Sequence, residues 1–292
     1  MYFGEIDREA AAQLIALALA EDLGTSTDVT TGALISRDQI GSVSIVARAS
    51  GVLAGLTVAQ MVLAEVDPAV NLKPQAADSA HLAPGQVVAR ISGPVRSLLI
   101  AERTCLNFLT HLSGIATLTR RYVDAIAGSR ADIYDTRKTL PGWRALQKYA
   151  VTAGGGKNHR MGLYDMVLIK DNHLAAWRAA AGERSLAAAV RAAQRLVPAG
   201  IDIEIEVDTL EQLADALAGD PDIVLLDNMS LDQMREAVAM RNDRAPGVEL
   251  EASGGVSLET VAAIAATGVE RISVGALTHS APALDLAFDW AL

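Results

Sequence analysis

The chain has 292 residues, of which 51% are hydrophobic and 21% charged, so it is long enough for one large domain or two smaller ones. Its net charge of -10 argues against nucleic acids and anionic membranes as partners. The single cysteine, Cys105, excludes an intrachain disulfide, and we expect it to be a buried packing thiol in a cytoplasmic protein.

The first half predicts an α+β domain. The apolar run over 10–20 follows an acidic N-terminus rather than the basic region of a signal peptide, and it predicts a buried helix too short to cross a membrane. Residues 41–49 and 85–91 alternate like strands of an antiparallel sheet, with a helix predicted over 57–66 between them.

A pair of helices, broken near Ser113 and Gly114, is predicted over 96–127 as the connection to the second half. We place the domain boundaries after 112 and after 278, with 279–292 returning to the first domain.

From about Ala131 onward, short apolar runs alternate with helical patterns. The runs cover 131–135, 165–169, 201–207, 222–226, 248–251 and 271–274. The helical patterns cover 186–197, 210–217, 231–240 and 258–266. This alternation predicts parallel βα units, and six runs instead of eight predict an incomplete barrel or missed strands.

Polar residues and glycines follow every run, at the end of a parallel sheet where active sites form. In chain order these residues are Thr136, Arg137, Lys138, Lys170, Glu206, Asp227, Ser253, Gly254, Gly255, Gly275 and His279.

Basic residues are concentrated between Arg137 and Lys170, where Asp165 is the only acid. Glycines and apolar residues interleave them, which favours an anion-binding site over a solvated basic face. Within this stretch, the sequence leaves open whether Arg144, Lys148 and Lys157 line the site or its rim. Two histidines, His111 and His173, are expected to be packed or capping residues.

Four of the strand ends have a specific chemical interpretation. Ser253-Gly254-Gly255, before a helix expected to begin near Ser257, predicts a phosphate site, with a plain turn as the alternative. Glu206 and Asp227 are candidates to hold a divalent cation, or to form ion pairs with Lys138 and Lys170. Lys170 is a candidate Schiff-base lysine or a fixed cation for an anionic group, and the surrounding cations favour the second.

Several blocks of the chain, in order, resemble the quinolinate phosphoribosyltransferase family. The most specific are Asp135-Thr136-Arg137-Lys138-Thr139, Gly156-Lys157-Asn158-His159-Arg160, Leu168-Ile169-Lys170-Asp171-Asn172-His173, Leu226-Asp227-Asn228 and Glu251-Ala252-Ser253-Gly254-Gly255. Two earlier blocks are Asp28-Val29-Thr30-Thr31 and Ala101-Glu102-Arg103-Thr104. Thr27 departs from the glycine that the family commonly has there.

The resemblance implies an N-terminal α/β sandwich domain and a C-terminal incomplete βα barrel of six or seven strands, assembled as a homodimer or hexamer. It implies that Arg103, Thr136, Arg137, His159, Arg160 and Lys170 surround quinolinate, with Arg103 supplied by the neighbouring subunit. It implies that Lys138, Lys170, Glu206 and Asp227 are catalytic and hold phosphoribosyl pyrophosphate with Mg²⁺, the two acids as metal ligands. Ser253, Gly254, Gly255, Gly275 and His279 would receive a phosphate.

The implied activity is the decarboxylating transfer of phosphoribose to quinolinate in NAD biosynthesis. Three alternatives stay open from the sequence: a molybdate-transport-associated protein of the same fold, a Schiff-base barrel aldolase that uses Lys170, and a nucleotide-binding protein without catalysis. The last leaves Glu206 and Asp227 without a purpose.

Overall fold

The structure, a computed structural model, describes residues 3–182 and 185–291 and forms two compact units. The first unit comprises Met1–Arg120, Lys138–Gly156 and Ala276–Leu292, and the second comprises Arg121–Arg137 and Lys157–Gly275. Because the units interleave along the chain, the domain boundaries placed after 112 and 278 stay predictions. No helix of the described residues combines the length and apolar character needed to span a membrane.

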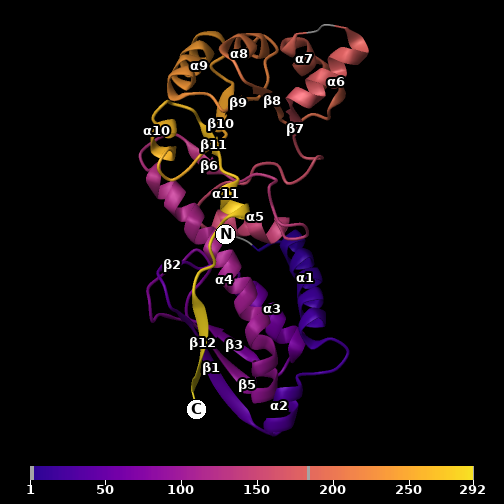
Figure 1. Cartoon of the computed structure of the whole chain (residues 1–292), viewed down its shortest axis with the longest axis vertical. Helices are drawn as coiled ribbons and strands as arrows, with labels where there is room; N and C mark the ends of the chain where they lie inside the picture. Colours follow the sequence, from indigo (N-terminus) through magenta and orange to yellow (C-terminus); the bar gives the residue numbers. More distant parts are fainter. Residues whose placement is uncertain (1–2, 183–184, 292) are drawn as a thin grey trace. The chain divides into compact units, whose positions relative to one another are not determined.

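The first unit is built on a four-stranded sheet in the order β12-β1-β5-β3 (Figure 1). Its strands are β1 (Ile40–Ala47), β3 (Asn71–Pro74), β5 (Val87–Pro94) and β12 (Leu286–Ala291), and a small separate pair is formed by β2 (Gly51–Val52) and β4 (His81–Leu82). The predicted antiparallel pairing of 41–49 with 85–91 is confirmed by β1 and β5. The C-terminal strand β12 adds to the free edge of β1, with Val43 opposite Trp290.

The helices of the first unit are α1 (Glu5–Leu23), α2 (Val29–Leu34), α3 (Leu56–Val66), α4 (Val95–Ala125, up to Arg120), α5 (Arg144–Ala153) and α11 (Ala276–His279). The helix predicted over 57–66 is confirmed as α3. The prediction of a buried helix over 10–20 is wrong in its burial: α1 contacts α3 and α5, but only Ala11 and Ile15 are buried. The apolar residues of this helix are not confined to the side that makes these contacts. Those on the other side are exposed, as Leu17 is at 68%.

The helix break predicted near Ser113 and Gly114 is also wrong, because α4 runs through both residues. Ser113 Oγ accepts a hydrogen bond from Ala54 N (3.0 Å), so its hydroxyl satisfies the backbone of a neighbouring loop. A Cβ on Gly114 would lie 2.1 Å from the carbonyl oxygen of Pro282. Ser113 and Gly114 therefore allow neighbouring backbone to pack closely against α4, and the helix does not end at them.

The second unit contains a six-stranded parallel sheet in the order β6-β11-β10-β9-β8-β7 (Figure 1). The strands are β6 (Asp132–Tyr134), β7 (Val167–Ile169), β8 (Ile203–Val207), β9 (Ile223–Asp227), β10 (Glu249–Ser253) and β11 (Arg271–Ser273). All six predicted runs are therefore strands, and the predicted incomplete barrel has six of them in the described part of the chain. In β9 the residues from Ile223 to Leu226 are all buried, as expected for a strand covered on both faces.

The helices of this unit are α6 (Asp171–Ala181), α7 (Leu186–Leu196), α8 (Leu210–Leu217), α9 (Leu231–Arg244) and α10 (Val261–Ala265). Helices α7, α8 and α9 match predicted helices, and each begins after a hydroxyl residue that accepts a backbone hydrogen bond: Ser185, Thr209 and Ser230. No helix was predicted over α6, where the sequence analysis noted only polar residues after the strand.

Candidate active site

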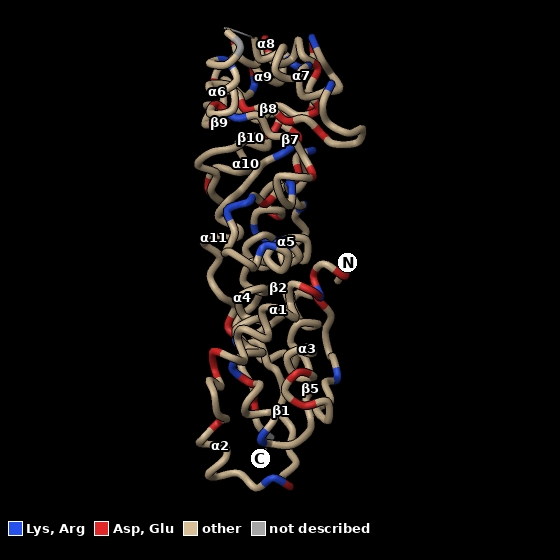
Figure 2. The backbone as a smooth tube through the Cα atoms, turned by 90° about the vertical axis from the view of Figure 1, so that its right-hand side faces the viewer, with Lys and Arg blue, Asp and Glu red and all other residues tan. Residues whose placement is uncertain are grey.

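Parallel pairing aligns the carboxyl ends of neighbouring strands at one edge of the sheet. Ile169 of β7 lies opposite Ile205 of β8, which brings the next residues, Lys170 and Glu206, together. Their side chains form an ion pair between Nζ and Oε2. On the other side, Asp227 of β9 lies directly opposite Ser253 of β10. Figure 2 shows segments of both charge signs along the backbone of the second unit.

Glu206 and Asp227 offer carboxylate oxygens from neighbouring strands at this edge. The Glu206 side chain is 13% exposed, and Asp227 is half-buried and accepts a hydrogen bond from Asn228 Nδ2 (2.8 Å). Carboxylates near a site for phosphates are the donors that Mg²⁺ takes, so these two residues fit the ion. Of the ion pairs considered from the sequence as the alternative, Lys170 with Glu206 is present.

Two half-buried arginines of the second unit act on each other electrostatically. Arg137 comes shortly after β6, and Arg160 comes shortly before β7. Burial and the charge of Arg137 lower the pKa of Arg160. Arg137 Nε is buried without a hydrogen-bond partner among the described residues. A bound anion would relieve both the repulsion and the unsatisfied donor.

Beneath these arginines lies a buried cluster of His159, Glu204, Glu251 and Arg271, which we call the acid–histidine network. His159 Nε2 lies 3.0 Å from Glu204 Oε2 and 3.3 Å from Glu251 Oε1. Arg271 Nε donates to Glu251 Oε2 (2.8 Å), and its guanidinium stacks on Tyr134, 3.8 Å from Cζ to the ring centroid. Glu204 and Glu251 are completely buried, so their charges depend on these partners.

The members of this network shift one another's pKa values. Burial raises the pKa of Glu204, whereas His159 and Arg271 hold the pKa of Glu251 below its usual range despite burial. Burial alone would lower the pKa of His159, but hydrogen bonds to both glutamates raise it to about 9. The four groups therefore titrate as one coupled unit.

The segment Ser253-Gly254-Gly255 forms a turn at the end of β10, with positive φ angles of 97° at Gly254 and 60° at Gly255. A Cβ on Gly254 would lie 2.1 Å from Asn228 Oδ1, so glycine is required by both its conformation and its close approach. The helix expected near Ser257 begins only at Val261, because Ser257 and Thr260 bond to each other in a turn. The helix dipole proposed from the sequence is therefore no argument for phosphate binding here.

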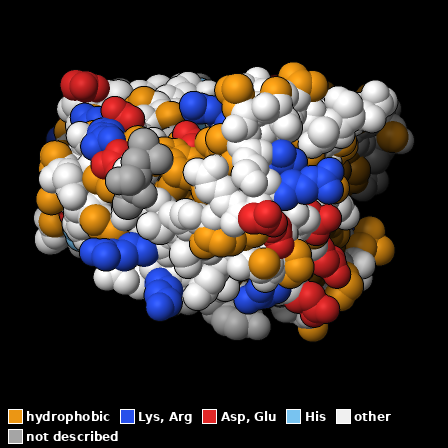
Figure 3. Space-filling model, turned by 90° about the horizontal axis from the view of Figure 1, so that it is seen from below, with side chains coloured by type: hydrophobic (Ala, Val, Ile, Leu, Met, Phe, Trp, Pro, Cys, Tyr) orange, Lys and Arg blue, Asp and Glu red, His pale blue; other side chains and the backbone are white. Residues whose placement is uncertain are grey.

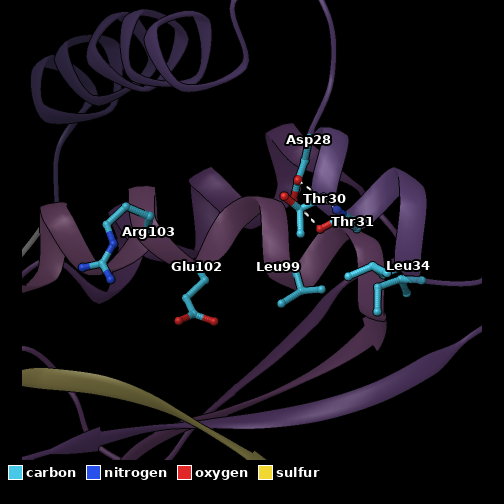
Figure 4. Close-up of a pocket in the computed structure, with 8 residues that line it drawn as sticks. Asp28, Thr30, Thr31, Leu34, Leu99, Glu102 and Arg103 are labelled. Atoms are coloured by element: carbon cyan, nitrogen blue, oxygen red, sulfur yellow. Dashed lines mark hydrogen bonds between the residues drawn. The ribbon is translucent and has the colours of Figure 1, made fainter.

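Three sequence-predicted residues belong to the first unit. Lys138 is exposed and its carbonyl accepts a hydrogen bond from Thr278 Oγ1 (2.8 Å). His279 ends α11 with its Nδ1 2.6 Å from Ser280 Oγ. Arg103 projects from α4 into an open pocket of about 510 Å³ that Glu102 and the start of α2 also line (Figure 4). The second unit holds the rest: Thr136, Arg137, His159, Arg160, Lys170, Glu206, Asp227, Ser253, Gly254, Gly255 and Gly275.

Most of the residues whose roles the sequence left open have structural partners. Lys157 Nζ binds Asp132 (2.6 Å) at the amino end of β6, away from the polar edge. His173 Nδ1 accepts from Lys170 N (3.0 Å) and caps α6. His111 packs edge-on against Trp143, and burial lowers its pKa. Arg144 donates to Thr139 Oγ1 (3.1 Å), and Lys148 is completely buried within α5.

Sequence reasoning gave no role to Asp135, Glu204, Glu251 or Arg271. Asp135 is completely buried and its Oδ1 accepts from His159 N (2.9 Å). The signal in the sequence was a carboxylate inside an apolar strand, as Glu204 is in β8 and Glu251 in β10. Such a residue needs a buried partner, but only the fold identifies His159 and Arg271 as those partners.

Comparison with known proteins identifies the family. Two family models match: quinolinate phosphoribosyl transferase, N-terminal domain, over residues 28–113 and C-terminal domain over residues 115–289. The chain is 48% identical to a nicotinate-nucleotide pyrophosphorylase [carboxylating] of Mycobacterium leprae, over 96% of this chain and 97% of that protein. A probable enzyme of the same name from Bacillus subtilis is 40% identical over 92% of this chain and 89% of its own.

Among solved structures, the nicotinate-nucleotide pyrophosphorylase from Francisella tularensis superposes with a TM-score of 0.89 at 37% identity, covering 97% of this chain and 96% of that one. The two-domain fold that the sequence resemblance implied is thereby confirmed. On both the family models and these relatives, the chain belongs to the quinolinate phosphoribosyltransferase family.

Proposed function

We propose that the protein is a decarboxylating quinolinate phosphoribosyltransferase, which converts quinolinate and phosphoribosyl pyrophosphate to nicotinate mononucleotide, carbon dioxide and pyrophosphate. Family membership supports this activity. The observation that carries it is the buried Nε of Arg137, which has no hydrogen-bond partner among the described residues, on an arginine whose charge lowers the pKa of Arg160. Quinolinate has two adjacent carboxylates, and a guanidinium meets each carboxylate with two parallel hydrogen bonds.

The proposed quinolinate site comprises Thr136, Arg137, His159, Arg160 and Lys170, all from the second unit. The cations serve to fix the ring so that its nitrogen faces the sugar. Holding two reactants in the attacking geometry supplies much of the rate gain when no covalent intermediate is formed.

Phosphoribosyl pyrophosphate is assigned to Lys138, Lys170, Glu206 and Asp227, with its 5′-phosphate at Ser253, Gly254, Gly255, Gly275 and His279. Glu206 and Asp227 would hold Mg²⁺, which neutralises charge on the leaving pyrophosphate. The two glycines at the end of β10 have positive φ angles, a conformation in which successive backbone N–H groups can form a concave anion site.

The chemistry needs positioned charge and no protein nucleophile. The pyridine nitrogen forms a bond to the sugar carbon while the bond from that carbon to pyrophosphate breaks. Carboxylates at the polar edge, Glu206 and Asp227, stabilise positive charge on the ribose ring. The product nitrogen is a pyridinium, which stabilises the electron pair left on the adjacent carbon when carbon dioxide departs. That carbon then takes a proton from water.

We further propose that the active site is shared between subunits of a homodimer or a hexamer, with Arg103 entering the neighbour's site. Arg103 is exposed and projects into an open pocket. Large apolar side chains of the first unit are also exposed, including Val29 and Leu34 of α2 at 75% and 76%. On the face shown in Figure 3, hydrophobic side chains lie between charged ones. Such exposed apolar residues favour coverage by another subunit.

The alternative activities lack comparable support. A Schiff-base aldolase needs a lysine free to attack a carbonyl, whereas Lys170 is engaged by Glu206. Against a molybdate-associated protein of the same fold, the relatives carry the name of the pyridine-nucleotide enzyme.

Turnover of quinolinate labelled in its 2-carboxylate tests the proposal. The purified protein with phosphoribosyl pyrophosphate and Mg²⁺ should release labelled carbon dioxide and form nicotinate mononucleotide in equal amounts. Omitting phosphoribosyl pyrophosphate is the control, because decarboxylation requires the pyridinium. No release from the folded protein would reject the activity.

A further inference from the structure

Two residues that the proposed function assigns to phosphoribosyl pyrophosphate, Lys138 and His279, lie on segments of the first unit that buried side chains join together. Both residues are exposed. Lys138 precedes α5, and His279 ends α11. These two helices contact each other and lie side by side in Figure 1. The inference drawn from this junction rests on the proposed function.

Thr278 makes the first connection between the two segments. It is 3% exposed, and its Oγ1 donates a hydrogen bond to the carbonyl oxygen of Lys138 (2.8 Å). The next residue along the chain is His279. One hydroxyl therefore ties the backbone of a residue assigned to the substrate to the residue that precedes another.

Gln147 of α5 makes the second connection, and it is completely buried. Its Oε1 accepts from Leu140 N (3.0 Å), and its Nε2 donates to Thr278 O (3.3 Å). Nε2 also lies 3.0 Å from His111 Nε2, which can accept because burial lowers the pKa of His111 and favours the neutral ring.

The orientation of the Gln147 amide is fixed by these partners. A backbone N–H such as that of Leu140 can only donate, and a carbonyl such as that of Thr278 can only accept. A buried side chain whose polar atoms are all engaged in this way holds the segments around it in one arrangement. Lys138 and His279 are therefore carried by backbones that Gln147 and Thr278 hold together.

We infer that Thr278 and Gln147 are positioning residues for phosphoribosyl pyrophosphate, which set the distance between the cation at Lys138 and the phosphate contact at His279. The pyrophosphate and the 5′-phosphate are attached to different carbons of the ribose. One substrate molecule can reach both contacts only when their spacing matches this separation. The inference concerns the spacing of the contacts, and it assigns neither Thr278 nor Gln147 a contact with the substrate.

Substitutions of Thr278 test this assignment. Thr278→Val removes the hydroxyl with little change in volume and should raise the KM for phosphoribosyl pyrophosphate about tenfold, whereas Thr278→Ser keeps the donor and should stay within about threefold of wild type. The KM for quinolinate should change by less than about twofold in both. The matched control is Thr267→Val, which removes a buried hydroxyl bonded to Ile264 O (2.7 Å) in the second unit and should leave both KM values within about twofold of wild type.

Inhibition by two fragments of the substrate separates spacing from direct contact. Pyrophosphate and ribose 5-phosphate each reach only one of the two contacts, so in Thr278→Val their inhibition constants should stay within about twofold of wild type. A hydroxyl that bound the substrate directly would instead weaken one fragment as much as the whole molecule.

Gln147→Met removes the polar contacts of the amide and keeps a side chain of similar length. It should reproduce the pattern of Thr278→Val, and combining the two should add less than about threefold to the KM for phosphoribosyl pyrophosphate, since both loosen the same junction. If Thr278→Val does not fold, as judged by circular dichroism, Gln147→Met decides by the same measurements.

Three results would overturn the inference: an unchanged KM for phosphoribosyl pyrophosphate in the folded variants, equal rises in both KM values, or a fragment that weakens in proportion to the whole substrate. Failure of the proposed function itself would appear differently, as a wild-type protein without quinolinate turnover.

Discussion

The two edges of the six-stranded sheet carry similar charges in different arrangements. At the amino edge, basic groups are matched by acids: Lys157 binds Asp132 at 2.6 Å, and Arg241 binds Glu270 at 2.8 Å. At the carboxyl edge, Lys170 is paired with Glu206, but the charge of Arg137 lowers the pKa of Arg160, and Arg137 Nε has no hydrogen bond within the described residues. Pairs that satisfy each other stabilise the fold, whereas a buried cationic donor left without a partner indicates an anionic ligand.

The largest contrast between the edges should come from two lysines. Lys170→Ala removes the cation at the carboxyl edge and should reduce turnover by at least about 10- to 150-fold, the equivalent of ~1.5–3 kcal/mol for one charge-assisted contact. Lys138 is assigned to the same substrate, phosphoribosyl pyrophosphate, so Lys138→Ala should reduce turnover to a similar extent. Lys157→Ala, at the amino edge, is the matched control and should retain wild-type kcat and KM. Steady-state kinetics on variants with unchanged circular dichroism measure this, and wild-type parameters for Lys170→Ala would refute its role.

Complementation between inactive variants tests whether the carboxyl edge is completed by another subunit. Arg103→Ala and Lys138→Ala, unfolded together and refolded, should form mixed dimers in which one site carries both lesions and the other is intact. With random reassortment, half of the dimers are mixed and half of their sites are intact, so activity should recover to roughly a quarter of wild type.

Each variant refolded alone is the control for this mixing experiment. If mass spectrometry finds mixed dimers and the mixture stays inactive, Arg103 acts within its own chain.

Gly254→Ala should raise the KM for phosphoribosyl pyrophosphate more than a glycine substitution elsewhere in the same unit. Its positive φ of 97° and the 2.1 Å approach to Asn228 Oδ1 leave no space for a methyl group. Strain of about 1–3 kcal/mol should raise the KM for phosphoribosyl pyrophosphate by about tenfold. Gly247→Ala, where a Cβ meets no atom within 4 Å, is the control. Equal KM values for the two variants would argue against a phosphate at this turn.

The smallest change in activity is expected from a thiol-specific reagent, whose target would be Cys105 in the first unit. The thiol is completely buried, burial raises its pKa, and Sγ lies 3.6 Å from Ala59 O. A buried protonated thiol reacts slowly, so the native enzyme should keep its activity in a thiol-specific reagent at neutral pH. Unfolding in denaturant should release one reactive thiol per chain. Rapid modification of the native protein with loss of activity would contradict this placement.

The sequence predicted the elements whose pattern is local. Each of the six strands is a short apolar run, and the polar residue after each run identified the edge where the site lies. The sequence failed where contacts between distant residues decide the structure. Gly114 predicted a helix break but lies against Pro282, and no helix was predicted over α6, which begins at Asp171. The acid–histidine network was missed because Glu204 and Glu251 are 47 positions apart and meet only through His159.

Selectivity between quinolinate and nicotinate tests most directly whether the unmatched arginines form a dicarboxylate site. Nicotinate lacks the 2-carboxylate, so it would leave one guanidinium unpaired in a half-buried site, and sites built on such polar contacts reject the incomplete ligand by about 10⁴-fold or more. We predict that kcat/KM for phosphoribosyl transfer to quinolinate exceeds that to nicotinate by at least about a hundredfold, and that Arg137→Ala narrows the ratio. Comparable kcat/KM values for the two acids in the wild-type enzyme would contradict the account.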